Sequence, residues 1–309
     1  MDKKINLLVD NIEKVIVGKR NVIIQTITAM LAEGHVLIED VPGVGKTQLV
    51  AALSRSVDGR FNRIQMTPDI MPSDITGFSM INKQTGDFEY RKGAAFCNFL
   101  LADEINRASP KAQSSLLEVM EEHQVSLDSN TYTLPKPFMT LATQNPVETY
   151  GTYHLPEAQM DRFIMKISMG YPEPAEELAI IGRTEYDNPI KSIGAVLTAD
   201  DIVALQEKVK QVKSAENVKN YIINIVKATR GNENIKLGVS PRGSIALYKT
   251  AKAFAFINDR DFITPDDVRQ CAVCTLAHRI ILSPKGKTSF GTPENMIFSI
   301  VSKTIVPTV

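Results

Sequence analysis

Short apolar-rich runs alternate with amphipathic segments over the first 190 residues of the chain. The runs with the length of a strand are residues 36–38, 61–66, 99–102, 138–142 and 163–167. The segments with apolar residues at helical spacing, or with an apolar helix-forming composition, are residues 5–15, 20–32, 48–53 and 110–122. Strands that alternate with helices in this way predict an α/β fold, in which helices cover both faces of a doubly wound parallel sheet of five strands.

Two further pairs of short runs predict β-hairpins. Residues 78–81 and 88–90 flank a turn at 83–86, and residues 125–127 and 131–134 flank Asp128-Ser129-Asn130.

From about Ser192 the pattern contains helices only. Thr198 and Thr264 each precede acidic residues, as helix N-caps do, and they predict helices that begin near residues 199 and 265. Further helices are expected at 218–229, 244–257 and 294–303. We therefore expect an α/β core over residues 1–190 and a smaller all-helical lid domain over residues 191–309.

The stretch from His35 to Thr47 predicts a phosphate-binding loop between a strand and a helix. Its glycines allow a tight turn whose N–H groups converge on an anion, Lys46 adds positive charge, and the Thr47 hydroxyl can bind a metal ion. The candidate binding residues are Gly43, Val44, Gly45, Lys46, Thr47 and Gln48. The strict pattern has a further glycine where this chain has Asp40, so a simple helix-start turn is the alternative interpretation.

Polar residues follow two later strands, where side chains reach the crevice above a doubly wound sheet. Asp103 is suited to a magnesium shell together with Thr47, and Glu104 is suited to polarising a water for attack on a terminal phosphate. Asn145 can orient the same water, although it is also a common turn residue before a proline such as Pro146. Two adjacent acids favour hydrolysis over transfer to a second substrate.

Two arginines are candidates for stabilising phosphate charge. Arg162 precedes the fifth strand, too far along the chain to reach its own loop comfortably, so a neighbouring copy is the expected recipient. Arg242 begins a helix of the second domain and is another candidate for facing a phosphate. Structural ion pairs are the alternative role for both.

Composition adds three constraints. The formal net charge is zero, but residues 1–190 carry 18 Lys and Arg against 25 Asp and Glu, whereas the remainder carries 17 against 10. These opposite charges can serve docking between copies or contact with nucleic acid, or can simply reflect different solvated faces. Three cysteines, with neither a signal peptide nor a membrane-spanning run, predict a cytoplasmic protein. Cys271, Cys274 and His278 have metal-ligand spacing, but core packing is the preferred interpretation.

Six motifs in combination resemble the MoxR family of AAA+ ATPases, over essentially the whole chain. They are Asp-Val-Pro-Gly-Val-Gly-Lys-Thr, Leu-Ala-Asp-Glu-Ile-Asn-Arg-Ala, Ala-Thr-Gln-Asn-Pro, Leu-Pro-Glu-Ala-Gln-Met-Asp-Arg-Phe, Ser-Pro-Arg-Gly and Leu-Ala-His-Arg. The resemblance implies ATP or ADP as nucleotide, Mg²⁺ as metal, a homo-oligomeric ring that is usually hexameric, and a partner with a von Willebrand factor A domain. It also implies that the two hairpins are insertions whose tips face the pore of the ring.

The resemblance also implies roles for individual residues. It makes Asn145 a first sensor, Arg162 an arginine finger and Arg242 a second sensor, and it brings the main chain at Val17 and Gly18 to the adenine. The function expected is magnesium-dependent ATP hydrolysis coupled to remodelling or maturation of other proteins. A nucleic-acid motor or loader and the motor subunit of a metal chelatase are the alternatives, the first disfavoured by zero net charge. The sequence does not identify the client protein.

Overall fold

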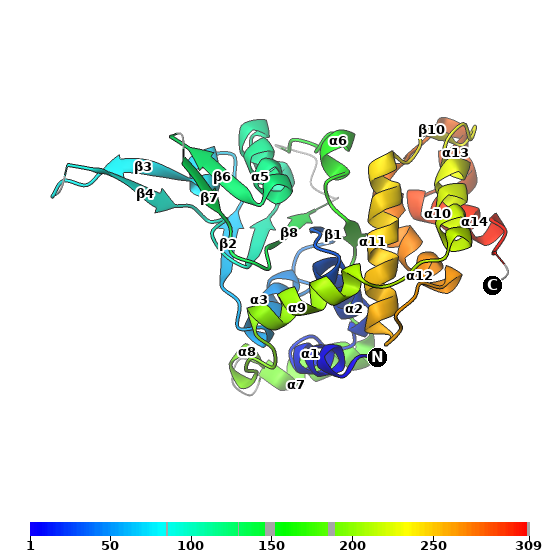
Figure 1. The fold of residues 1–309 in the computed structure, drawn as a ribbon, viewed down its shortest axis with the longest axis horizontal. Coiled ribbons are helices and arrows are strands. Elements are labelled where there is room, and N and C mark those ends of the chain that lie inside the picture. Colours follow the sequence, from blue (N-terminus) through cyan, green and yellow to red (C-terminus); the bar gives the residue numbers. More distant parts are fainter. Residues whose placement is uncertain (85, 129, 146–151, 185–188, 308–309) are drawn as a thin grey trace.

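The predicted strands form one parallel sheet in the computed structural model, which describes all residues except 85, 129, 146–151, 185–188 and 308–309 (Figure 1). The strands are β1 (Val36–Glu39), β2 (Phe61–Gln65), β5 (Phe99–Asp103), β8 (Met139–Gln144) and β9 (Met165–Ile167). Their order in the sheet is β2-β5-β8-β1-β9. Gln65 lies opposite Asp103, and Glu39 lies opposite Gln144, so the carboxyl ends of four strands meet at one edge. The predicted fold class is confirmed.

Each face of the sheet has its own hydrophobic cluster. Successive strand residues point to opposite faces, and Val36 and Ile38 accordingly belong to one cluster while Leu37 belongs to the other. The first cluster includes α1 (Lys3–Glu13), α2 (Arg20–Leu31) and α3 (Lys46–Ser56), and the second includes α5 (Pro110–Glu122). These helices match the four predicted segments.

The chain after about residue 192 is mostly helical, as predicted. Its helices are α9 (Ala199–Lys210), α10 (Glu216–Thr229), α11 (Pro241–Ile257), α12 (Pro265–Leu276), η2 (Ala277–Arg279), α13 (Pro284–Phe290) and α14 (Pro293–Lys303). Two helices that precede it, α7 (Pro174–Thr184) and α8 (Pro189–Ser192), were not predicted. Thr198 and Thr264 both form capping boxes, which confirms the two predicted helix starts. The expectation of helices only is wrong in one place, because β10 (Ile235–Leu237) and β11 (Ile281–Leu282) form an antiparallel ribbon. Strands this short do not produce a readable alternation of polar and apolar residues.

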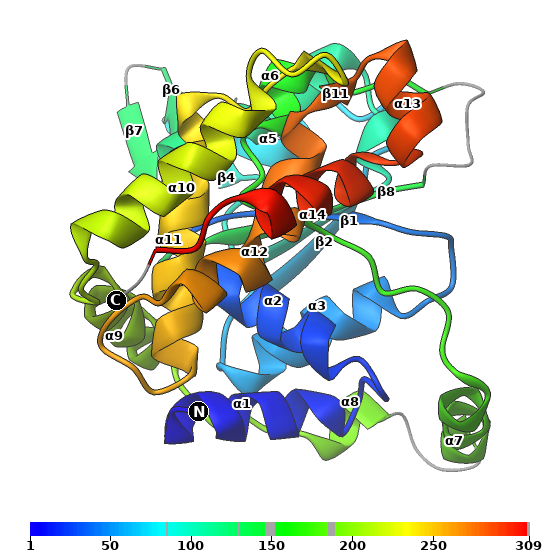
Figure 2. The ribbon, with the colours of Figure 1, turned by 90° about the vertical axis from the view of Figure 1, so that its right-hand side faces the viewer.

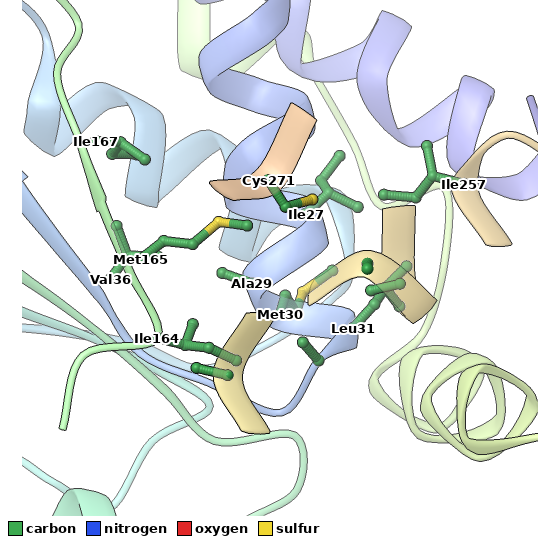
Figure 3. Close-up of a cluster of buried hydrophobic side chains, with 14 of the residues drawn as sticks. Ile27, Ala29, Met30, Leu31, Val36, Ile164, Met165, Ile167, Ile257 and Cys271 are labelled. Atoms are coloured by element: carbon green, nitrogen blue, oxygen red, sulfur yellow. The ribbon is translucent and has the colours of Figure 1, made fainter. Parts of the chain in front are cut away.

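Helix α2 joins the sheet to the helices that follow it. Figure 3 shows Ile27, Ala29 and Met30 of α2 between Val36 of the sheet and Ile257 of α11. The same cluster includes Cys271 of α12, with Cys274 packed against it, in agreement with the core-packing interpretation of these cysteines. Core and lid therefore share one hydrophobic cluster, and the boundary at residue 190 stays a prediction.

Both predicted hairpins are present, although residues 85 and 129 in their turns lie outside the described residues. They consist of β3 (Gly77–Ile81) with β4 (Phe88–Lys92), and β6 (Gln124–Leu127) with β7 (Asn130–Thr133). The first hairpin projects from the body of the molecule (Figure 1) and exposes Phe78, Ile81 and Phe88. Tyr90 stacks on Tyr132 with ring centroids 4.0 Å apart, so the two hairpins support each other.

The remaining elements are short: α4 (Pro72–Thr76), η1 (Ile105–Arg107) and α6 (Glu157–Met160). Figure 2 shows α7 at the periphery of the molecule, away from the lid helices α10, α11, α12 and α14. Within the described part of the chain, helices of sufficient length and apolarity to span a bilayer are absent.

His35 gives the fold a predictable response to pH. Its Nδ1 accepts from the Thr140 amide at 2.9 Å and its Nε2 lies 2.8 Å from the Met120 carbonyl, so the ring is neutral with its proton on Nε2. Burial lowers the pKa of His35 from 6.5 to about 4. The unfolded chain therefore binds the proton first as pH falls, and stability is lost between about pH 6.5 and pH 4.

We expect His35 to lower the free energy of unfolding by about 2 kcal/mol at pH 5 relative to pH 7.5. The His35→Gln variant, whose amide can keep both hydrogen bonds, should lose this part of the pH dependence in urea unfolding experiments. The exposed His154→Gln variant is the matched control and should behave like the wild type. An unchanged pH dependence in His35→Gln would contradict a buried neutral imidazole.

Candidate nucleotide site

The carboxyl edge of the sheet carries a cavity of about 320 Å³. It is lined by Pro42, Gly43, Gly45, Lys46, Thr47, Gln48, Arg63, Asp103, Glu104 and Asn145. The structure thus brings together the predicted loop, the acid pair and the candidate sensor Asn145, which come from three different segments. Pro146, which follows Asn145, lies outside the described residues.

Two glycines shape the loop. Gly43 and Gly45 have φ of 87° and 93°, a region that L side chains rarely adopt. Gly45 is the N-cap of α3 and provides no side-chain cap, so the first N–H groups of the helix face the cavity and can bind an anion. Lys46 Nζ donates to the Asp40 carbonyl at 2.9 Å, which holds the ammonium group against the loop.

Asp40, at the position of the missing glycine, anchors the loop to the chain after β9. Its Oδ2 accepts from the amides of Met169 and Gly170 at 2.6 and 2.7 Å and from the Ser168 hydroxyl at 3.1 Å. Its Oδ1 accepts from the Val41 amide at 2.9 Å. The departure from the strict pattern therefore adds four hydrogen bonds that a glycine would not make.

The two acids are held in different ways. Asp103 Oδ1 accepts from the Thr143 hydroxyl at 2.5 Å, and the Glu104 amide donates to the same hydroxyl at 2.8 Å. Glu104 has φ of 58°, which is rare outside glycine and turns its side chain away from the strand direction. Its Oε2 accepts from Gln65 Nε2 at 2.8 Å and lies 3.4 Å from Arg107 Nε.

Sequence reasoning did not identify Arg63 and Gln65 of β2. Arg63 Nη2 lies 2.6 Å from Asp103 Oδ2 and 3.3 Å from Gln65 Oε1, so β2 connects both acids in one network. A sequence signal was available. These two polar residues are two positions apart in an otherwise apolar-rich strand, which puts them on one face.

The donor set fits Mg²⁺. Asp103 and Thr47 both line the cavity and supply oxygen atoms, the ligands that this hard cation prefers, while substrate phosphates and water commonly complete its shell.

A second cavity of about 250 Å³ adjoins the loop on its other side. It is lined by Val15, Ile16, Val17, Lys19, Gly43, Val44, Gly45, Gln48, Met169, Pro172 and Ile180. Most of these side chains are apolar, which suits a nucleotide base. Gly18 has φ of 70°, which L side chains rarely adopt, and a Cβ there would also require the Glu176 side chain to move. Contact of Val17 and Gly18 with the base stays a prediction.

Arg162 and Arg242 lie elsewhere. Among the described residues, the lining of the phosphate cavity includes neither, and both instead line a third cavity of about 180 Å³. Arg162 Nη2 lies 3.2 Å from Glu121 Oε2, and Arg242 pairs with Oε1 of the same carboxylate. Arg242 is therefore not part of the phosphate cavity of its own chain, and its role in nucleotide binding stays a prediction.

A buried ion pair explains this position of Arg242. Arg279 of η2 is 7% exposed, and its Nε donates to Asp161 Oδ1 at 2.8 Å. Asp161 Oδ2 accepts from Ser240 Oγ at 2.8 Å, which fixes the start of α11 beside Arg162. Burial lowers the pKa of Arg279 to about 10. This pKa is still well above neutral pH, so the guanidinium stays charged.

Comparisons with known proteins find matches to both parts of the chain. A family model described as "ATPase family associated with various cellular activities (AAA)" matches residues 35–165, and one described as "AAA lid domain" matches residues 227–297. YeaC of Bacillus subtilis is 50% identical over 97% of this chain and 93% of its own length. Chaperone MoxR1 of Mycobacterium tuberculosis is 38% identical over 96% of this chain and 81% of its own length.

A crystal structure from Cytophaga hutchinsonii, described as that of "a putative ATPase", is also similar. It superposes with a TM-score of 0.92 at 39% identity, over 99% of this chain and 95% of that one. Both the nucleotide-binding part and the lid therefore have counterparts in a solved structure.

The role of Asp40 leads to a prediction. Asp40→Gly restores the strict loop pattern but removes the anchor to residues 168–170, so we expect nucleotide affinity to fall about tenfold. Fluorescence anisotropy with a labelled ADP measures this effect. Ser168→Ala removes one of the four hydrogen bonds and should have a smaller effect. Tighter binding by Asp40→Gly would show that the aspartate is not an anchor.

Proposed function

Because the chain belongs to the MoxR family of AAA+ ATPases, we propose that it assembles into a hexameric ring and uses magnesium-dependent ATP hydrolysis to remodel or mature partner proteins. ATPase activity itself follows from the family. The ring, the metal and the coupling to partners are the parts that we propose.

One observation carries the proposal of a ring. The phosphate cavity and the pair formed by Arg162 and Arg242 lie at different places on the same chain. An arginine is the group best suited to stabilise the spread charge of a phosphoryl transition state. A neighbouring chain that presents its arginine pair to this cavity would complete the site, and each copy would both give and receive the pair.

The residues that line the cavity divide the proposed chemistry among them. Bound Mg²⁺ would be held by Thr47 and Asp103 and would offset negative charge on the phosphates. Lys46 and the N–H groups at the start of α3 bind the phosphates. Glu104 accepts a proton from the attacking water, while Gln65 holds its carboxylate at 2.8 Å and Asn145 orients the water.

Two surface features support assembly and partner binding. Residues 1–190 carry more acidic than basic residues and residues 191–309 carry the reverse, so the two parts of neighbouring chains attract each other. The hairpin of β3 and β4 exposes Phe78, Ile81 and Phe88, which suits contact with a client protein in the pore. A partner with a von Willebrand factor A domain and a cytoplasmic location are further proposals, and the three free cysteines fit the latter.

We expect Glu104→Gln to bind ATP as well as the wild type but to hydrolyse it about 100-fold more slowly or worse, because the amide cannot accept the proton. Phosphate release and labelled-nucleotide binding measure the two effects. Glu118→Gln, an exposed change on α5, is the control. Normal turnover by Glu104→Gln would refute the role given to Glu104.

Mixing experiments test the ring. Arg162→Ala and Lys46→Ala should each be inactive alone, but their mixture should recover activity, because an intact loop meets an intact arginine from the neighbour. A mixture of Lys46→Ala with Glu104→Gln, whose defects lie at the same site, should stay inactive. If the first mixture also stays inactive, the arginines do not act between chains.

A further inference from the structure

Glu121 forms ion pairs with both arginines of the proposed neighbour contact. Oε2 of its carboxylate faces Arg162 Nη2 at 3.2 Å, and Oε1 pairs with Arg242. The three residues come from the end of α5, the segment between α6 and β9, and the start of α11. One carboxylate therefore joins the core and the lid at the point where both present an arginine.

We propose that Glu121 is a positioning residue for ATP hydrolysis, which holds Arg162 and Arg242 as a pair ready for the terminal phosphate of a neighbouring chain. The inference rests on the proposed function, since it requires that the arginines act between chains. Glu121 does not touch the reacting atoms. It acts through the two guanidinium groups.

The charge balance of the third cavity explains why such a residue is needed. Arg162, Arg242, Arg279 and Lys249 all line it, and Asp161 is committed to Arg279 and Ser240. Glu33, the other carboxylate in the lining, pairs with Lys210 at 3.1 Å. Without Glu121, the guanidinium groups of Arg162 and Arg242 would repel each other with little opposing charge nearby.

Glu121 also reduces the ordering that the arginines would otherwise undergo on assembly. Residues close to them in the same chain already hold both in place. Asp161, which precedes Arg162, pairs with Arg279 and accepts from Ser240, and the Ser240 hydroxyl accepts from the Arg242 amide at 3.1 Å. The long side chains have many rotamers, and pairing with a shared carboxylate restricts both before the neighbour arrives. Less of the binding energy between neighbouring chains is then used to order the two arginines, and more of it can stabilise the transition state.

A phosphate can replace the Glu121 carboxylate as the partner of the two arginines. The side chains of Glu121, Arg162 and Arg242 are 36%, 30% and 48% exposed, so water weakens their pairing. A terminal phosphate carries more negative charge than one carboxylate and offers more acceptor oxygens. The arginines can therefore move from Glu121 to the phosphate without leaving a buried charge behind.

The test compares Glu121→Gln with Glu122→Gln, an exposed change at the next residue that removes the same charge from the same end of α5. We expect kcat of Glu121→Gln to fall about tenfold with KM for ATP changed less than twofold, because phosphate binding at the loop is untouched. Glu121→Asp keeps the charge on a shorter side chain and should recover part of the loss. Glu122→Gln should match the wild type.

A mixing experiment separates positioning from a general structural role. Glu121→Gln has an intact loop, so its mixture with Lys46→Ala, which supplies an intact arginine pair, should be more active than either variant alone. A chain that folds or assembles poorly would not be restored in this way. Thermal unfolding and gel filtration of Glu121→Gln should match those of Glu122→Gln.

The outcomes distinguish this inference from the proposed function. If Arg162→Ala is restored by Lys46→Ala but Glu121→Gln has the kcat of Glu122→Gln, the role of Glu121 is refuted and the ring mechanism stands. If neither Arg162→Ala nor Glu121→Gln is restored by Lys46→Ala, the arginines do not act at the site of a neighbouring chain. The proposed role of Glu121 is then refuted as well. Higher kcat in Glu121→Gln would mean that the carboxylate restrains the arginines and would also refute positioning.

Discussion

The position of the lid depends on the buried ion pair between Asp161 and Arg279. Arg279 makes further hydrogen bonds to the carbonyls of Asp161 and Phe163, at 3.1 and 2.7 Å, so the end of α6 and η2 form one unit. Removing either partner would leave a charge in a poorly hydrated place, which is strongly unfavourable. Ser240 adds the start of α11 to this unit. The lid is therefore fixed beside β9, and its Arg242 lies with Arg162 rather than at the loop of the same chain.

The segment from Asp161 to Gly170 connects this unit to the nucleotide site. Its middle part is β9, which pairs with β1, and its end donates two amide hydrogen bonds to Asp40. The loop and the arginine pair are thus attached to opposite ends of one short stretch of chain. Because β9 is an edge strand, this stretch is also the border of the sheet. The geometry explains how an aspartate at the first position of the loop anchors the loop to this stretch, although a strict pattern would require glycine.

Local signals in the sequence were sufficient for the five strands of the parallel sheet, most helices, the two hairpins and the loop, because each depends on nearby residues. Gly43 and Gly45 need only their own backbone, and Thr198 and Thr264 cap helices within three residues. The position of Arg242 depends on Asp161 and Arg279, which are far apart in the chain, and no local pattern reports such a contact. Arg63, Gln65 and Glu121 were missed for the same reason. Their partners lie on other elements, and an arginine, a glutamine or a glutamate alone is usually a solvated surface residue.

Burial separates the two ion-pair systems that hold the arginines. In the pair of Asp161 and Arg279 the side chains are 17% and 2% exposed. The side chains of Glu121, Arg162 and Arg242 are each at least 30% exposed. A buried pair resists exchange because each charge has lost its water, and an exposed pair exchanges readily because water replaces the partner. The first system therefore suits a permanent frame and the second suits a contact that a phosphate can take over. A site shared between chains needs both, since the arginines must be in place before the neighbour binds and must then be free to leave their carboxylate.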